Sequence, residues 1–202
     1  MASGAGNSPR ERRRGLYRSF AQLRQAEPPD AYAIASTPCA TATAIVAPHG
    51  GRIESGTSAV ARAIAGEDLS LYLFEGRRRR GNWEHLHIDS ERFDEPMCLK
   101  LVATAERVVT VHGARGIVPV VYVGGRDAAL ADRIADALNA AGFHASRTMR
   151  PALQGLHHDN ICNRGTSGAG VQLEMSIGLR RLCRNTARLD AFAAAVRDAL
   201  RR

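Results

Sequence analysis

Short apolar runs alternate along the chain with longer segments in which apolar residues recur every three or four positions. The short runs predict buried or half-buried strands, and they cover residues 31–36, 43–46, 69–75, 84–89, 107–111, 118–125, 143–148 and 171–176. The longer segments predict amphipathic helices, which cover residues 16–25, 57–65, 95–106 and 126–141 and the segment from residue 186 onward. Strands that alternate with helices predict a single α/β domain, with an open, mixed but largely parallel sheet flanked by helices.

Two segments interrupt this alternation. Residues 1–16 are polar and rich in arginine, glycine and serine, which predicts a flexible basic arm ahead of a domain formed by residues 17–202. Residues 151–170 contain no long apolar run and predict a long loop. A chain of 202 residues is long enough for one domain with a sizeable core, and no internal repeat divides it.

Positive charge is concentrated in two short segments. The formal net charge is +8, of which residues 1–20 contribute +4 and the run Arg77–Arg80 another +4, so the other residues sum to zero. The basic character therefore belongs to the arm and to one loop. Either these segments are simply solvated, or they attract a polyanion, which could be a nucleic acid or an acidic polymer.

The pattern of apolar residues does not predict a membrane protein. No apolar run reaches the roughly 18–20 residues of a spanning helix, and no apolar segment of a secretory signal follows the N-terminal arginines. We therefore expect a cytoplasmic protein. The four cysteines are widely spaced and form no CxxC pair, so we expect buried thiols and no disulfides.

The stretch IVAPHGGRIESGTS, residues 45–58, carries the first candidate chemistry. Its apolar strand is predicted to end at Pro48, which puts His49 and Glu54 on the loop that follows. The two residues can converge if the pair of glycines after His49 folds the backbone back with positive φ. Open α/β sheets place their sites at strand ends, and a histidine with a carboxylate suits a catalytic zinc, which takes three protein ligands.

A second apolar strand ends in the same way. In VTVHGARG, His112 and a glycine follow directly after a buried run, so His112 is expected on the same rim of the sheet as His49. Two histidines that merely end strands would give the same pattern. Glu174 lies within the apolar run VQLEMS. Because an unpaired carboxylate is costly to bury, Glu174 is a further candidate for a functional role.

A series of motifs resembles the poly-γ-glutamate hydrolase family, which is found in bacteriophages and in bacterial genomes. The motifs are PHGGRIESGTS, LYLFEG with the following NW, LHIDSERFDEP, VHGARG, VYVGG, NICNRG and GVQLEMS. They follow the family's order between Ala31 and Leu182, so the resemblance covers most of the chain. It does not extend to the N-terminal arm or to Arg77–Arg80.

The resemblance implies a zinc enzyme with a carboxypeptidase-like α/β fold that hydrolyses γ-glutamyl amide bonds. The site residues that it implies are the metal ligands His49, Glu54 and His112, the catalytic residues Glu174 and Arg115, and the substrate-binding residues Asn163 and Arg164. Amide hydrolysis by such a site needs a zinc-activated water and a general base, here Glu174. It also needs a guanidinium at the oxyanion, from Arg115 or Arg164, although Arg164 could instead form a structural ion pair.

The expected partner is the anionic polymer poly-γ-glutamate, bound by a monomer, and we expect neither a membrane nor a nucleic acid as partner. Release by host lysis is the expectation if a phage encodes the chain. Two alternatives stay open. The same zinc site could act on a cell-wall γ-glutamyl linkage or a small N-acyl amino acid, or the chain could be a basic binding module with a structural metal. Surface or supporting roles are expected for the remaining histidines of interest, which are His85, His87, His157 and His158.

Overall fold

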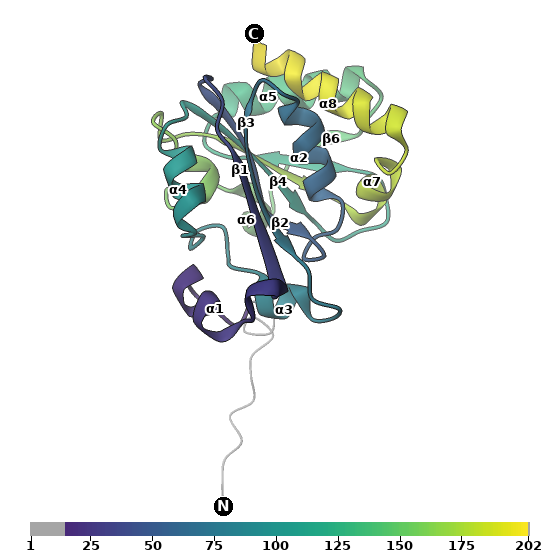
Figure 1. Cartoon of the computed structure of the whole chain (residues 1–202). Coiled ribbons are helices and arrows are strands. Elements are labelled where there is room, and N and C mark those ends of the chain that lie inside the picture. The colour runs from purple at the N-terminus through teal and green to yellow at the C-terminus, as the bar shows by residue number, and fades with distance from the viewer. Residues whose placement is uncertain (1–14, 202) are drawn as a thin grey trace, which may run out of the picture.

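The central sheet has the strand order β1-β3-β2-β4-β7-β5-β6 in the computed structural model, which describes residues 15–201 (Figure 1). The strands are β1 (Tyr32–Thr37), β2 (Thr43–Gly51), β3 (Ser70–Gly76), β4 (Arg107–Gly113), β5 (Val121–Gly124), β6 (Ala145–Arg147) and β7 (Val171–Met175). Four of the six strand pairs are parallel, while β1 runs antiparallel to β3 and β5 antiparallel to β7. The prediction of a mixed, largely parallel α/β sheet is therefore confirmed.

Helices cover both faces of the sheet (Figure 1). The first face is covered by α2 (Thr57–Ala65), α5 (Ala128–Ala140), α7 (Ile177–Leu182) and α8 (Thr186–Arg201). The second face is covered by α1 (Phe20–Ala26) and α4 (Pro96–Val102). Shorter elements are η2 (Pro29–Ala31), α3 (Asn82–Leu86), α6 (Pro151–Gln154) and η3 (Ile161–Asn163). The sheet thus separates two hydrophobic cores, one beneath each set of helices.

The alternation of side chains in β7 decides which residues face the site. Val171, Leu173 and Met175 are fully buried in the core on the first face, where each contributes roughly 1.5–3 kcal/mol by leaving water. Because side chains alternate along a strand, Gln172 and Glu174 point to the second face. Burial of the apolar set therefore fixes the direction of the two polar side chains.

The predicted strand at residues 84–89 is wrong. Residues 82–86 form α3, which follows Gly81 in the left-handed region at a φ of 70°. Leu86 closes this helix and Ile88 lies in the extended segment after it, and both are fully buried. Leu86 and Ile88 are thus two buried apolar residues two positions apart, which is also the spacing of residues on one face of a strand. This pattern led to the wrong prediction.

The prediction that Pro48 ends its strand is also wrong. β2 continues to Gly51, with a shift in its pairing with β3 between Ala47 and Gly50. Pro48 has no amide hydrogen for the ladder, and the irregularity accommodates it. His49 is consequently part of the strand end, and only 1% of it is exposed.

Other boundaries differ from the prediction by a turn or less, or by short added elements. The segment predicted as a long loop contains α6 and η3, and the sequence did not predict α7. The predicted elements at residues 95–106 and 143–148 are shortened to α4 and β6.

The four cysteines carry free thiols, and all but Cys39 are buried. No helix within residues 15–201 is long and apolar enough to cross a membrane. The proposed arm, residues 1–16, lies almost wholly outside the described residues.

Candidate metal centre

A tight loop after β2 carries Glu54 back towards His49. The Glu54 amide donates to the His49 carbonyl at 3.0 Å, and the Thr57 hydroxyl donates to the Glu54 carbonyl at 2.9 Å. These bonds close the loop directly before α2. The helix itself begins after Gly56, which has a φ of 102°.

The two glycines after His49 have different roles. Gly51 has a φ of 62°, as the folded-back loop requires, but Gly50 does not have a positive φ. A Cβ at Gly50 would instead lie 2.3 Å from the Ser58 hydroxyl oxygen and 3.0 Å from the Phe74 carbonyl oxygen. Gly50 is therefore needed for close packing, and only Gly51 for its conformation.

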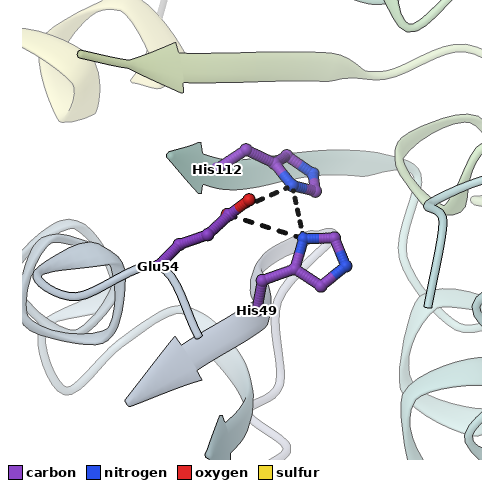
Figure 2. Close-up of side chains that lie close together, drawn as sticks. All are labelled: His49, Glu54 and His112. Atoms are coloured by element: carbon purple, nitrogen blue, oxygen red, sulfur yellow. Dashed lines mark hydrogen bonds and ion pairs between the residues drawn. The ribbon is translucent and has the colours of Figure 1, made fainter. Parts of the chain in front are cut away.

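Three polar side chains converge where β2 and β4 end (Figure 2). His49 Nδ1 lies 3.2 Å from His112 Nδ1 and 3.5 Å from Glu54 Oε2, and His112 Nδ1 lies 4.0 Å from the same oxygen. The Gly113 amide donates to Glu54 Oε2 at 2.7 Å, which fixes the carboxylate against β4. All three side chains are at most one-tenth exposed.

The hydrogen bond behind His49 sets its tautomer. His49 Nε2 lies 2.7 Å from the Ile88 carbonyl oxygen, which can only accept, so Nε2 carries the proton in the neutral ring. The Nδ1 lone pair of His49 then faces His112 and Glu54. A backbone carbonyl is one of the groups that accept a hydrogen bond from a metal-ligating histidine and fix the orientation of its ring.

The electrostatics of the cluster favour the metal-binding protonation states of Glu54 and His112. Burial alone would raise the pKa of Glu54, but His49 first and then His112 and His87 lower it to about 2. Burial, reinforced by His49, lowers the pKa of His112 to about 3. An ionised carboxylate and a neutral imidazole are the forms that bind metals. For His49, burial would lower the pKa, but the neighbouring Glu54 carboxylate raises it above the ordinary value, so a metal would have to displace a proton there.

The donor set fits a tetrahedral zinc ion. Bond lengths of 2.0–2.1 Å in that geometry place neighbouring ligand atoms roughly 3.3 Å apart. The separations around His49 Nδ1 are 3.2 and 3.5 Å, close to this value, and the third, from His112 Nδ1 to Glu54 Oε2, is longer at 4.0 Å. A cation between the two imidazole nitrogens and the carboxylate would be bound by all three ligand atoms at once. His49, Glu54 and His112 are therefore the residues that could hold zinc.

His49, Glu54, His112 and Glu174 line one cavity, which has a volume of about 290 Å³. Glu174 on β7 pairs in register with His112 on β4, so the sheet itself places the carboxylate beside the cluster. Gln172 Nε2 donates to Glu174 Oε1 at 3.0 Å. Burial, and secondarily the Glu54 charge, raise the pKa of Glu174 well above its ordinary value, whereas Arg180 lowers it. A buried carboxyl with a raised pKa is suited to accept and return a proton.

His87 also reaches the cavity. Its ring stacks on His49, with 4.0 Å between centroids, and Trp83 stacks on its other side at 4.9 Å. Burial, together with His49, lowers the pKa of His87 well below its ordinary value. The sequence analysis predicted a surface or supporting role for His87 but placed the residue on a strand that does not form, so its contact with a candidate ligand was not predicted.

The candidate metal ligands do not include His85, His157 or His158. His85 Nδ1 lies 2.9 Å from the buried Glu27 carboxylate, and His85 does not line the cavity. His157 is exposed at the rim of the cavity, and its ring stacks on His158 at 4.5 Å.

The structure does not bring the three remaining predicted residues into the cavity. Arg115 and Arg164 are exposed, and neither lines it. Asn163 is buried, and its amide donates to the carbonyls of Gly155 and His157 at 2.8 and 2.9 Å. Asn163 thus shapes the loop that forms one wall of the cavity. A guanidinium that does act on the cluster electrostatically belongs to Arg180, which the sequence did not indicate.

The comparisons with known proteins agree with one another. A family model described as poly-gamma-glutamate hydrolase matches residues 17–195. Two proteins of Bacillus subtilis (strain 168) are similar: UPF0714 protein YndL, 38% identical over 167 residues, and SPbeta prophage-derived UPF0714 protein YoqZ, 39% identical over 171 residues. These matches cover 82% and 84% of this chain, but 66% and 62% of the relatives. The chain therefore spans less than two thirds of the length of these curated relatives.

Two solved structures have the same fold. A bacteriophage poly-gamma-glutamate hydrolase is 30% identical with a TM-score of 0.88, over 93% of this chain and 97% of that chain. A structure described as YndL in a zinc-free apo form is 34% identical with a TM-score of 0.87, over 93% of this chain and 98% of that chain.

Proposed function

The chain belongs to the poly-γ-glutamate hydrolase family, and from this premise we propose that it is a zinc-dependent hydrolase of γ-glutamyl amide bonds in poly-γ-glutamate. The observation that carries the proposal is the convergence of His49, Glu54 and His112 in one cavity with Glu174. Two relatives support it. One is described as a poly-γ-glutamate hydrolase and the other as zinc-free in its apo form, a description that marks zinc as its metal.

The proposed chemistry divides between the metal and Glu174. Zinc held by His49, Glu54 and His112 would supply Lewis acidity and lower the pKa of a water molecule. Glu174 then accepts the proton of the attacking water and delivers it to the amine nitrogen that departs. The raised pKa of Glu174 makes its carboxylate a stronger base towards the water, and the proton gained in that step is the one passed to the leaving nitrogen.

The exposed arginines suit a different role. Each residue of poly-γ-glutamate carries an α-carboxylate, which a guanidinium can bind through two hydrogen bonds. Arg115 and Arg164 lie outside the cavity, so we propose that they bind carboxylates of the polymer away from the scissile bond. We propose that Asn163 supports substrate binding through the loop that it holds. In this proposal the protein acts as a monomer, in the cytoplasm or after host lysis.

Metal analysis combined with a substrate panel tests the proposal. We expect about one zinc per chain and a shift of poly-γ-glutamate to shorter lengths on a sizing column, both lost after treatment with a chelator. Muropeptides and N-acyl amino acids form the rest of the panel, with release of free amines as the readout. Zinc-dependent release from those compounds, with the polymer left intact, would instead favour a cell-wall or small-molecule amidase. A zinc-loaded protein that cleaves none of them would favour a binding module.

A further inference from the structure

Arg180 of α7 donates to the backbone of three separate segments. Its Nη1 donates to the Ser55 carbonyl at 2.8 Å, its Nε to the Met175 carbonyl at 3.1 Å, and its Nη2 to the Ala114 carbonyl at 3.2 Å. A guanidinium presents its donors in a rigid planar fork. One side chain therefore holds the loop after β2, the end of β4 and the end of β7 at fixed separations.

The three acceptors are next to candidate site residues in the sequence. Ser55 follows Glu54, Met175 follows Glu174, and Ala114 lies two positions after His112. The bonds thus fix the backbone from which two candidate zinc ligands and the candidate general base project. None of these hydrogen bonds goes to a side chain, so they depend little on which residues occupy the acceptor positions.

The guanidinium is also packed tightly against this backbone. A Cβ added at Gly113 would lie 2.8 Å from Arg180 Cζ and 2.8 Å from Glu54 Cβ. A Cβ added at Gly56 would lie 3.3 Å from Arg180 Cβ. The glycines leave the space that Arg180 fills, and little room remains for the Glu54 loop to shift.

Arg180 has the charge that this position requires. Burial lowers the pKa of its guanidinium, while the charges of Glu54 and Glu174 raise it. An arginine stays protonated under such conditions, so it offsets part of the negative charge of both carboxylates. Because its fork is used on the backbone, it does not contact a substrate in the cavity.

We propose that Arg180 is a positioning residue that fixes Glu54, His112 and Glu174 relative to one another, and thereby sets zinc affinity and kcat. The inference rests on the proposed function for the identity of the metal and the reaction. Residues that orient metal ligands from behind typically change metal affinity or activity by roughly 10- to 100-fold when they are replaced. That range is the effect we expect for Arg180.

The test compares Arg180→Ala and Arg180→Lys with Arg181→Ala. Arg181 is a matched control, because it is the next residue on the same helix, has the same charge, and forms no side-chain hydrogen bond or ion pair within residues 15–201. Zinc affinity is measured by competition with a chromophoric chelator, and kcat and KM by polymer cleavage. We expect Arg180→Ala to lose roughly 10- to 100-fold in zinc affinity and in kcat, with a few-fold change in KM. Arg181→Ala should match the wild type.

The lysine variant and chemical rescue separate geometry from charge. Lysine keeps the charge but is a single point donor that cannot reach three carbonyls, so Arg180→Lys should recover little of either loss. A cavity of about 410 Å³ borders the Arg180 side chain. Ethylguanidine added to Arg180→Ala should therefore restore zinc affinity and kcat, whereas ethylammonium should not.

Several results would overturn the inference. One is an Arg180→Ala variant with the zinc affinity and kcat of Arg181→Ala. Another is rescue by ethylammonium as effective as rescue by ethylguanidine. If Arg180→Ala does not fold, as judged by circular dichroism, Arg180→Lys decides, and wild-type zinc affinity in that variant rejects the positioning role. A wild type that binds zinc but leaves the polymer intact would reject the proposed substrate alone, since the zinc measurements would still test Arg180.

Discussion

The Nδ1 atom of His49 lies 3.2 Å from the Nδ1 atom of His112, although 63 positions separate the two residues in the sequence. Both rings are almost fully buried. The two nitrogens share one proton or, in the proposed function, one zinc ion, and the predictions below distinguish these two cases.

We predict that His49→Ala or His112→Ala removes zinc, because either change leaves only two ligands. The measurement is zinc content after dialysis, with the exposed His158→Ala as control. Trp83, the single tryptophan, stacks on the ring of His87, which in turn stacks on the ring of His49. Its fluorescence should therefore change on zinc titration of the wild type. Full zinc occupancy in the double variant His49→Ala/His112→Ala would assign the metal to other residues.

We predict that Glu174→Gln keeps the fold and the zinc but loses hydrolysis. Glutamine has nearly the same shape, and its amide oxygen can still accept the hydrogen bond from Gln172. It cannot take up a proton from water, so kcat should fall by roughly 10²- to 10⁴-fold, whereas KM should change much less. Zinc content, Tm and kcat are measured on one preparation. A stable, zinc-loaded variant with kcat within a few-fold of wild type would exclude Glu174 as the general base.

The arginine run after β3 divides into two kinds of residue. Arg78 forms an ion pair with the buried Glu27, whereas Arg77, Arg79 and Arg80 are exposed. We predict that replacing the three exposed arginines by alanine raises KM for the polymer and weakens the dependence of the rate on salt, with kcat nearly unchanged. Steady-state kinetics across a range of ionic strength measure this. Identical salt profiles for the variant and the wild type would mean that the exposed arginines are only solvated.

Glu27 predicts a pH-dependent contribution to stability. Burial alone would raise its pKa, but hydrogen bonds from Tyr17 and His85, with the charge of Arg78, lower it below the ordinary value of 4.5. A carboxylate with a lowered pKa stabilises the fold above its unfolded-state pKa, and that contribution is lost as the pH falls through the folded value.

We therefore predict that Glu27→Gln destabilises the fold at pH 7, by roughly 1.5–3 kcal/mol for hydrogen bonds to a buried charge. The difference in Tm from the wild type should shrink below pH 4.5 and vanish in stronger acid. Thermal melts across pH measure it, with the exposed Glu67→Gln as control. A deficit that is constant down to pH 2 would mean that shape, and not charge, is what Glu27 contributes.

The sequence predicted the strands and the cluster for one physical reason. Apolar runs mark the buried strands, parallel strands end at one rim, and His49 and His112 each follow such a run. Glu174 was identified because a carboxylate inside an apolar run needs an explanation. These signals are local, so they can be seen without coordinates.

Arg180 and His87 could not be identified in the same way. Arg180 acts on backbone carbonyls, which have no sequence signature, and it lies on a short helix among several arginines. The position of His87 depends on its stacking between His49 and Trp83. Both roles arise from tertiary contacts between distant segments, for which composition and period carry no signal.

The in-register pair of His112 and Glu174 restricts how the central strands can change length. Inserting or deleting one residue inside β7 would reverse its faces, turning Glu174 into the core beneath the helices and an apolar neighbour into the cavity. We expect the same for β4 and His112. Substitutions can adjust these strands one side chain at a time, whereas we expect changes of length between the strands, as in the four-arginine segment after β3. We therefore expect such a scaffold to diverge in function through its connecting loops and through side-chain replacement.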